Sequence, residues 1–345
     1  MNEAHTSNNP RRILIVLMGS LGDVVRGMSL VSPIKTAYPK CELSWLVEPK
    51  CEGIVKLNPK IDNVILFDRR RPLKSLLGLA GQLKRAQFDL VLDLQRHLKS
   101  GLFSWLTRAP RRIGFHRANA KEFNWLFNNE QIGRYPADAP KLEHYLKFLE
   151  KIGVEYSQPR VDFSLEDGMR RSADTRARLG EKYCAVVLGS SWPSKDWPAE
   201  GYLKLLQLLL AESQMKVALL GDGGQLDLSG RLESSAASER VINLAGRTAL
   251  DELVAVVSRA AFCIGPDSGP GHIAGALGVP YISLFGPTSD SRTAPHGSRE
   301  LVVKAHLGCM PCYRRKCPGL DRLCMRLISA EAVMQKARQF IAGGV

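Results

Sequence analysis

Two loops in the second half of the chain combine small residues with a charged side chain, as anion-binding loops do. Residues 189–198 follow an apolar run and include Ser190, Ser191 and Lys195. Hydroxyl and backbone N–H groups can donate to a phosphate, and the ammonium supplies the opposite charge. Residues 221–225 are glycine-rich and contain Asp222, so a ligand could approach their backbone closely. Ordinary helix capping beside a surface lysine is the alternative for the first loop, and a common glycine turn for the second.

Residues 265–272 give a stronger signal, because a carboxylate at the end of an apolar run is followed by small residues that begin a helical pattern. The candidates are Asp267, Ser268, Gly269 and His272. Free amides and the helix dipole favour an anion at such a position. Asp267 could also be only an N-cap. Gly286, Pro287 and Thr288 follow the next apolar run and complete the set of loops.

Asp23 is the candidate for acid–base chemistry in the first half of the chain. It ends the loop 19–23, directly after the apolar run 13–18. The loop lacks the G-x-G-x-x-G spacing of a dinucleotide site, and an acid there would repel pyrophosphate. A carboxylate in this place is better suited to accept a proton from a substrate hydroxyl. A structural cap is the alternative.

These loops need a framework of buried strands alternating with helices. Short apolar runs and helical patterns alternate in both halves, which predicts an α/β protein with two doubly wound parallel sheets. We expect a polar tail at 1–12, a first domain at 13–170 and a second at 171–345. Within the first domain, 24–38 reads as one helix and 158–167 as a strand and linker. Ligands of such sheets bind at the carboxyl ends of the strands, so the best site is expected in a cleft between the domains.

Net charge and composition indicate which kinds of molecule the protein binds. The 345 residues carry a net charge of +14, of which residues 1–165 contribute +10. The basic groups are scattered and are not interleaved with aromatic residues, which favours an anionic membrane or glycolipid, or a merely solvated surface, over nucleic acid. No apolar run is long enough to span a membrane, and the N-terminus does not read as a signal peptide. We therefore expect a cytoplasmic protein that is attracted to an anionic membrane or glycolipid surface.

Four clustered cysteines do not fit the anion-binding pattern. Cys309, Cys312, Cys317 and Cys324 have the spacing C-x2-C-x4-C-x6-C among several basic residues. This spacing matches no common metal motif, so it does not decide the state of the cysteines. The alternatives are free or partly oxidised thiols, a structural zinc and an iron–sulfur cluster. Our expectation is that no metal is bound and that no cofactor is needed.

Taken in order, these motifs resemble the bacterial ADP-heptose:lipopolysaccharide heptosyltransferases, glycosyltransferase family 9. The resemblance runs from Arg12 to about Ile341. The segments that carry it are residues 15–25, 89–95, 111–115, 195–198, 267–272 and 284–288. Members of the family often have His or another residue where this chain has Arg26.

The resemblance implies a GT-B architecture, in which two Rossmann-like domains face each other across a cleft. It implies an acceptor on the first domain, a nucleotide-sugar on the second, and Asp23 as general base. Ser190, Ser191 and Lys195 would bind the donor diphosphate, and Asp267 would contact the donor sugar region. The expected reaction is inverting transfer of heptose from ADP-heptose to the Kdo or heptose of a lipid A-linked inner core.

Two other readings remain. The same fold could use a different nucleotide-sugar or a surface-polysaccharide acceptor, or the chain could be a non-catalytic nucleotide- or nucleic-acid-binding protein. Asp23 argues against the non-catalytic class, because a pure binder gains nothing from an acid in that place.

Overall fold

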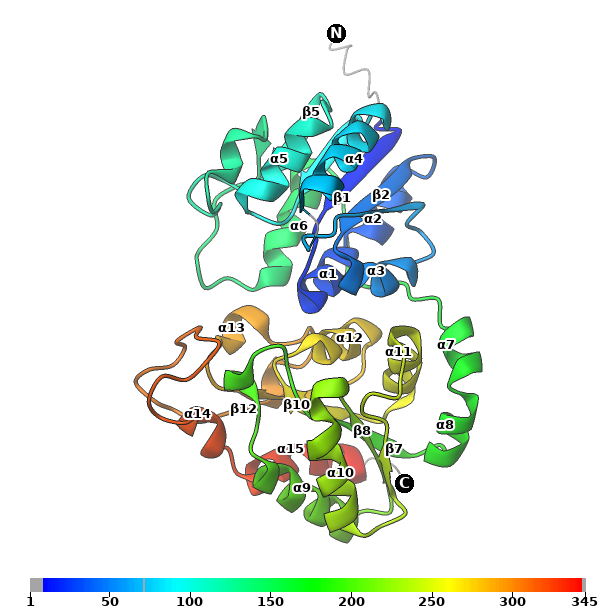
Figure 1. The fold of residues 1–345 in the computed structure, drawn as a ribbon, viewed down its shortest axis with the longest axis vertical. Helices are drawn as coiled ribbons and strands as arrows, with labels where there is room; N and C mark the ends of the chain where they lie inside the picture. The colour runs from blue at the N-terminus through cyan, green and yellow to red at the C-terminus, as the bar shows by residue number, and fades with distance from the viewer. Residues whose placement is uncertain (1–8, 71, 343–345) are drawn as a thin grey trace. The chain divides into compact units, whose positions relative to one another are not determined.

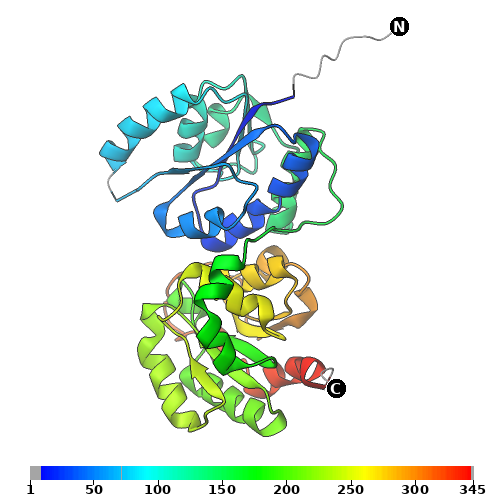
Figure 2. The same ribbon diagram turned by 90° about the vertical axis from the view of Figure 1, so that its right-hand side faces the viewer.

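The computed structural model describes residues 9–70 and 72–342. The chain divides into two compact units, Met1–Ser164 and Leu165–Val345, whereas the sequence placed the boundary at 170/171. Each unit is built on a six-stranded parallel sheet, which confirms the predicted α/β, doubly wound fold. Figures 1 and 2 show helices on both faces of each sheet.

The sheet of the first unit has the order β3-β2-β1-β4-β5-β6. Its strands are β1 (Arg12–Val16), β2 (Glu42–Val47), β3 (Asn63–Leu66), β4 (Leu90–Asp93), β5 (Arg111–Gly114) and β6 (Glu130–Gln131). Its helices are α1 (Leu21–Met28), α2 (Val31–Ala37), α3 (Pro49–Lys56), α4 (Pro72–Arg85), α5 (Leu98–Leu106), η1 (Asn124–Leu126) and α6 (Lys141–Lys151). The central strands β1 and β4 are almost entirely buried, as their continuous apolar sequences require.

Two predictions for the first unit were wrong. Residues 24–38 form α1 and α2 rather than one helix, because Pro33 has no N–H to donate to the carbonyl of Ser29 four residues earlier. Ser29 closes α1 with a side-chain bond to the Arg26 carbonyl, at 2.7 Å. Residues 158–165 contain no strand; Ser164 instead bonds the Leu57 carbonyl at 2.7 Å before α7 begins.

The second unit has the order β12-β11-β10-β7-β8-β9. Its strands are β7 (Tyr183–Val187), β8 (Lys216–Leu220), β9 (Val241–Asn243), β10 (Cys263–Pro266), β11 (Tyr281–Phe285) and β12 (Val302–Lys304). Its helices are α7 (Glu166–Arg171), α8 (Ala173–Leu179), η2 (Pro193–Lys195), α9 (Ala199–Glu212), η3 (Gly223–Gln225), α10 (Leu226–Ala236), α11 (Leu250–Arg259), α12 (Gly269–Leu277), α13 (Asp290–Thr293), η4 (Arg299–Leu301), α14 (Leu323–Arg326) and α15 (Ala330–Ala342).

Both units share one topology. Counted along each unit, the strands lie in the order 3-2-1-4-5-6, so the connections reverse direction between β1 and β4 and between β7 and β10. The carboxyl ends of these strand pairs are the switch points at which doubly wound sheets bind ligands. Asp23 follows β1, while Lys195 and Asp267 follow β7 and β10. The fold therefore places the predicted residues at the two switch points.

Candidate active site

Asp23 lies in the first turn of α1 and makes bonds to side chains from two helices. Its carboxylate contacts the Arg26 guanidinium at 2.7 Å and the Lys141 ammonium at 2.8 Å. The Ser20 hydroxyl donates to the same carboxylate at 3.2 Å. Ser20 occupies the N-cap position of α1, and no side chain caps this helix. The alternative in which Asp23 is only a cap is therefore not what the structure shows.

Lys141 is a site residue that the sequence did not reveal. It begins α6, 118 residues after Asp23 in the chain, and α6 packs against α1. Burial lowers the pKa of Lys141, and the Asp23 carboxylate opposes this effect. The one signal in the sequence is its position at the start of an amphipathic helix, which does not indicate its partner.

The loop that carries Asp23 is held from the neighbouring strand. Gln95 follows β4; its side-chain oxygen accepts from the Met18 N–H at 2.8 Å, and its amide donates to the Gly19 carbonyl at 3.2 Å. The apolar face of α1 buries Val24, Val25 and Met28. Asp23 and Arg26 are thus fixed on the opposite, more accessible side of the helix.

Asp267 is the centre of a buried network at the switch point of the second unit. Its Oδ2 contacts the Lys195 ammonium at 2.8 Å and accepts from the hydroxyls of Thr288 at 2.8 Å and Thr293 at 3.2 Å. The His272 Nε2 lies 3.5 Å from the other carboxylate oxygen. Burial would raise the pKa of Asp267, but the His272 hydrogen bond and the Lys195 charge together hold that pKa well below its ordinary value. Asp267 is therefore ionised at neutral pH.

Helix α12 begins directly after this carboxylate. Ser268 is its N-cap residue, Gly269 its first residue, and no side chain satisfies the first backbone N–H groups. Its glycine-rich start lets α12 approach β11 closely, because a Cβ on Gly271 would lie 2.8 Å from ring carbons of Tyr281. The predicted group Asp267, Ser268, Gly269 and His272 thus lies together, at a helix start whose first backbone N–H groups have no side-chain cap. Thr288 was expected here from its loop, whereas Thr293 on α13 was not.

Lys195 reaches Asp267 from the loop after β7. Its ammonium also donates to the Asp267 carbonyl at 3.1 Å and lies 4.8 Å from the ring centre of Trp192. Ser190 is turned into its own loop, where its hydroxyl donates to the Trp192 carbonyl at 3.0 Å, while Ser191 is exposed. The structure therefore joins Lys195 to the Asp267 network and leaves the two serines outside it.

Asp222 has a structural role in the loop after β8. It is the N-cap of η3, where its carboxylate accepts from the Gly224 N–H at 2.8 Å and Gln225 completes a capping box. Within the described residues it makes no hydrogen bond or ion pair with Lys195 or Asp267. Its assignment to donor binding stays a prediction.

The cysteine-rich segment packs against the Lys195 loop. The Ser194 hydroxyl donates to the Arg314 carbonyl at 2.6 Å, and the Ser194 N–H donates to the Arg315 carbonyl at 3.2 Å. Backbone N–H groups of residues 322, 320 and 319 lower the pKa of Cys317. All four thiols are free, and across residues 9–70 and 72–342 no three His, Cys, Asp or Glu side chains are arranged to hold a metal ion. This segment supports the Lys195 loop through its backbone.

In the part of the chain that the structure describes, no helix is long and apolar enough to cross a membrane.

A pocket of about 350 Å³ in the second unit is lined in part by Thr288, Asp290, Lys304 and His306. Because Thr288 also holds Asp267, this pocket adjoins the network.

Comparisons with known proteins agree with this arrangement. Residues 76–321 match the model of glycosyltransferase family 9 (heptosyltransferase). The chain is 30% identical over 298 residues to the lipopolysaccharide core heptosyltransferase OpsX of Haemophilus influenzae, covering 86% of this chain and 85% of the relative. A family 9 glycosyl transferase from Veillonella parvula superposes with a TM-score of 0.80 at 20% identity, covering 97% of this chain and 98% of the other. The heptosyltransferase WaaC of E. coli, solved with ADP, superposes with a TM-score of 0.75 at 22% identity, covering 95% and 99%.

Proposed function

Because the chain belongs to glycosyltransferase family 9 (heptosyltransferase), we propose that it transfers heptose from ADP-heptose to the Kdo or heptose of a lipopolysaccharide inner core. The observation that carries this proposal is Asp23, a partly exposed acid in the first turn of α1, after β1, that is held by side chains rather than used as a helix cap. A relative named as a lipopolysaccharide core heptosyltransferase supports the acceptor, and a fold neighbour solved with ADP supports the donor.

Asp23 is the general base in this proposal. Its carboxylate accepts the proton of the attacking acceptor hydroxyl as the new glycosidic bond forms at the anomeric carbon. Arg26 and Lys141 fix the orientation of the carboxylate. The oxygen of the departing ADP leaves from the opposite side of that carbon, so the configuration inverts.

The second unit stabilises the leaving group in this proposal. Two of the three N–H groups of Lys195 donate to Asp267, which leaves the third for a diphosphate oxygen. The first amides of α12, with Ser268 and Gly269, add uncharged donors at the positive end of the helix. Asp267 holds the ammonium in place and, with His272, faces the donor sugar, while Ser190 and Ser191 extend the diphosphate site.

A change of donor or acceptor within the same fold is the second candidate. The family resemblance implies an acid in the loop that binds the donor ribose, and Asp222 is its only counterpart in this sequence. The capping role of Asp222 favours the second candidate, because it leaves the adenosine ribose without an assigned acid. A non-catalytic binding role is disfavoured by Asp23.

The proposal includes peripheral contact with the inner membrane, because a lipid A-linked acceptor resides there. The basic balance of +10 in residues 1–165 supports this contact. The expected setting is the cytoplasmic face of that membrane.

A donor screen tests the proposed function. The purified chain is incubated with a Kdo-bearing lipid A acceptor and, in separate reactions, ADP-heptose, a UDP-sugar or a GDP-sugar. Mass spectrometry should show a heptose-sized gain only with ADP-heptose, and NMR should show an anomeric configuration opposite to that of the donor. Preferred use of a UDP- or GDP-sugar would support the second candidate, and retained configuration would exclude direct displacement.

A further inference from the structure

Residues 69–121 account for the positive charge of the first unit. This segment contains 13 Lys and Arg against two Asp and no Glu, a balance of +11 in a chain of net charge +14. Neither acid offsets the charge at the surface: Asp89 accepts from the backbone N–H groups of Arg11 and Arg12, and Asp93 is fully buried. The segment includes α4, β4, α5 and β5. Arg69, Arg70 and Arg111 pair with acids outside the segment, Glu48, Asp68 and Glu130, and the positive charge that remains attracts an anionic surface.

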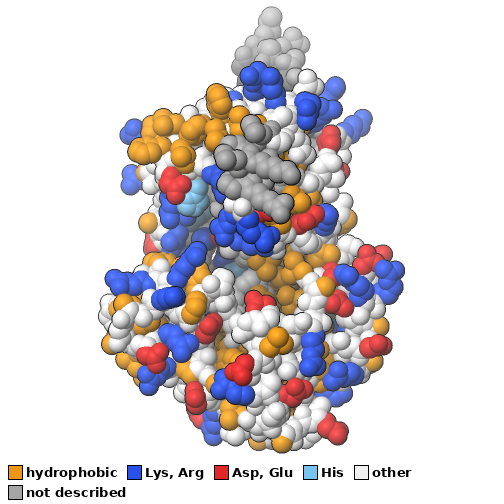
Figure 3. Space-filling view, viewed as in Figure 1, with side chains coloured by type: hydrophobic (Ala, Val, Ile, Leu, Met, Phe, Trp, Pro, Cys, Tyr) orange, Lys and Arg blue, Asp and Glu red, His pale blue; other side chains and the backbone are white. Residues whose placement is uncertain are grey.

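The same segment and the short helix after it expose large apolar side chains. The α5 patch comprises Leu98 and Trp105 on α5 with Phe123 and Leu126 at η1, whose exposed fractions are 47%, 54%, 68% and 62%. Helices α5 and η1 pack against each other, so these side chains belong to one region. Figure 3 shows hydrophobic side chains gathered over the position of α5 in Figure 1. Exposed apolar groups of this size within one region indicate an interaction surface.

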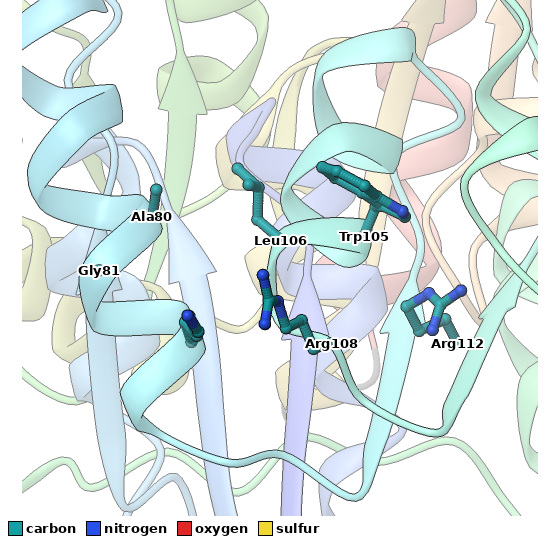
Figure 4. Close-up of a pocket in the computed structure, with 7 residues that line it drawn as sticks. Ala80, Gly81, Trp105, Leu106, Arg108 and Arg112 are labelled. Atoms are coloured by element: carbon teal, nitrogen blue, oxygen red, sulfur yellow. The ribbon is translucent and has the colours of Figure 1, made fainter.

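A pocket of about 530 Å³ lies between α4 and α5, beside this patch. Its apolar wall comes from Ala80, Gly81, Trp105 and Leu106, and its cations are Lys84, Arg108 and Arg112. Figure 4 shows Arg108 between the two helices, with Ala80 and Gly81 on α4 on one side and Leu106 and Trp105 on α5 on the other. Arg112 is held by the carbonyls of Phe127 at 3.1 Å and Ala109 at 2.6 Å. None of the described residues that line the pocket is acidic, so no carboxylate there competes with an anion for the three cations.

This combination fits an anionic amphiphile. Lysine and arginine bind phosphate oxygens, and tryptophan is stable at a membrane interface because its ring is apolar and its N–H is polar. A second copy of the chain would bring the same positive field to this surface and would be repelled. A nucleic acid would leave the aliphatic part of the α5 patch without a partner.

We propose that this pocket and the α5 patch dock the first unit on an anionic phospholipid bilayer, with lipid phosphates at Lys84, Arg108 and Arg112 and with Trp105 among the headgroups. The inference rests on the proposed function in one respect, since a lipid-linked acceptor gives the enzyme a reason to reside at a membrane. Asp23 is not among the residues that line the pocket, so the pocket cations and Asp23 can be tested independently.

Vesicle flotation tests the docking surface. The full chain should float with vesicles that contain phosphatidylglycerol and should remain at the bottom with phosphatidylcholine alone. A cation near an anionic membrane contributes about fivefold to binding, so the double variant Lys84→Ala/Arg108→Ala should bind about 30-fold more weakly. The matched control is Lys204→Ala/Arg178→Ala, which removes two exposed cations from the second unit and should bind like the wild type. Equal binding by both double variants would overturn the proposal.

Quenching by bromine-labelled phosphatidylglycerol tests the depth of Trp105. Trp45 and Trp197 are buried, and Trp192 lies in the second unit. Trp125 lies in η1 beside the patch but is only half-buried, so the more exposed Trp105 should supply most of the quenched fluorescence. Trp105→Phe should keep vesicle binding and lose most of the quenching. Unchanged quenching in this variant would contradict the assignment. A different oligomeric state of Trp105→Phe and the wild type in sedimentation would also contradict it, because the patch would then be an interface between copies.

A soluble, deacylated acceptor separates this inference from the proposed function. The double variant Lys84→Ala/Arg108→Ala should transfer heptose to that acceptor at the wild-type rate. If the wild type binds anionic vesicles but transfers no heptose, the proposed function fails and the docking surface stands. If the wild type transfers heptose but the double variant still binds vesicles normally, the proposed docking surface is wrong and the proposed function is unaffected.

Discussion

Lys195 and Asp267 depend on each other, because both are charged, Asp267 is buried and Lys195 is partly buried. The sequence indicated both residues but separately, as a loop cation for phosphate and as an acid near the donor sugar. The structure joins them at 2.8 Å and adds Thr288, Thr293 and His272 around the carboxylate. A buried ion pair of this kind is stable only when its remaining hydrogen-bonding groups are satisfied. The pair therefore supplies a fixed ammonium to the proposed diphosphate site.

Lys195→Ala should weaken ADP binding at least tenfold. The variant loses a hydrogen bond from a charged group to the diphosphate, which contributes about 1.5–3 kcal/mol. Isothermal titration calorimetry with ADP measures this directly. Lys204→Ala, an exposed lysine on α9, serves as the control and should bind ADP like the wild type. Unchanged ADP affinity in Lys195→Ala would mean that the loop after β7 does not bind the diphosphate.

Asp267→Asn should destabilise the protein in a pH-dependent way. The pKa of Asp267 is lower in the folded than in the unfolded chain, so its ionised form stabilises the fold above about pH 4. This contribution is lost progressively as the pH falls below that value. Calorimetry should show a large difference in Tm between the wild type and the variant at pH 7 and a smaller one in acid. Asp227→Asn, at an exposed ion pair with Arg231, should change Tm little at either pH. A gap in Tm that is the same at both pH values would contradict the account.

Residue types predicted the candidate groups but not their partners. Asp23 was found because an acid at a strand end is unusual, whereas Lys141 is an ordinary helical lysine until α6 packs against α1. Thr293 could not be identified for the same reason, since it reaches Asp267 from α13. Asp222 shows a second limit, because a cap and a ligand-binding acid look alike in sequence, and its assignment to donor binding stays a prediction. Contacts between distant elements depend on tertiary packing, which local patterns do not encode.

At the scale of elements, hydrophobic periodicity predicted most strands and helices, since apolar runs and helical patterns are set by burial. It missed the break at Pro33 between α1 and α2, because the apolar pattern continues across it. It also assigned a strand to 158–167, where no neighbouring strand is present to pair with it among the described residues. Periodicity reports which residues are buried, and it does not report hydrogen-bond partners.

Gly271→Ala should destabilise the second unit by about 1–3 kcal/mol, the usual cost of overpacking a core. The added methyl would lie 2.8 Å from ring carbons of Tyr281, a fully buried side chain whose hydroxyl donates to the Pro266 carbonyl. Urea unfolding measures the change. Gly230→Ala on α10 is the matched control: nothing lies within 4 Å of its added methyl, so alanine should stabilise by about 0.5–1 kcal/mol. Equal midpoints for the two variants would show that α12 does not depend on this close approach.

At the scale of the whole molecule, the chain uses one topology twice and places a different chemistry at each switch point. The first unit presents a carboxylate held by two cations, and the second presents an ammonium held by a carboxylate at the start of a helix. A base and a phosphate site are the two requirements of direct displacement from a nucleotide-sugar. The excess of positive charge lies in the first unit, in which the acceptor is proposed to bind.

Transfer by Asp23→Asn is the measurement that tests the central claim most directly. Wild type and variant are compared with ADP-heptose and a Kdo-bearing lipid A acceptor, with the heptosylated product followed by mass spectrometry and ADP affinity by calorimetry. Asp138→Asn, an exposed acid in the same unit, is the control for loss of a charge. We expect Asp23→Asn to slow transfer by about 10²- to 10⁴-fold, since it removes the base, while ADP affinity stays at the wild-type value. Heptose transfer by Asp23→Asn at the wild-type rate, or no transfer by the wild type, would contradict the account.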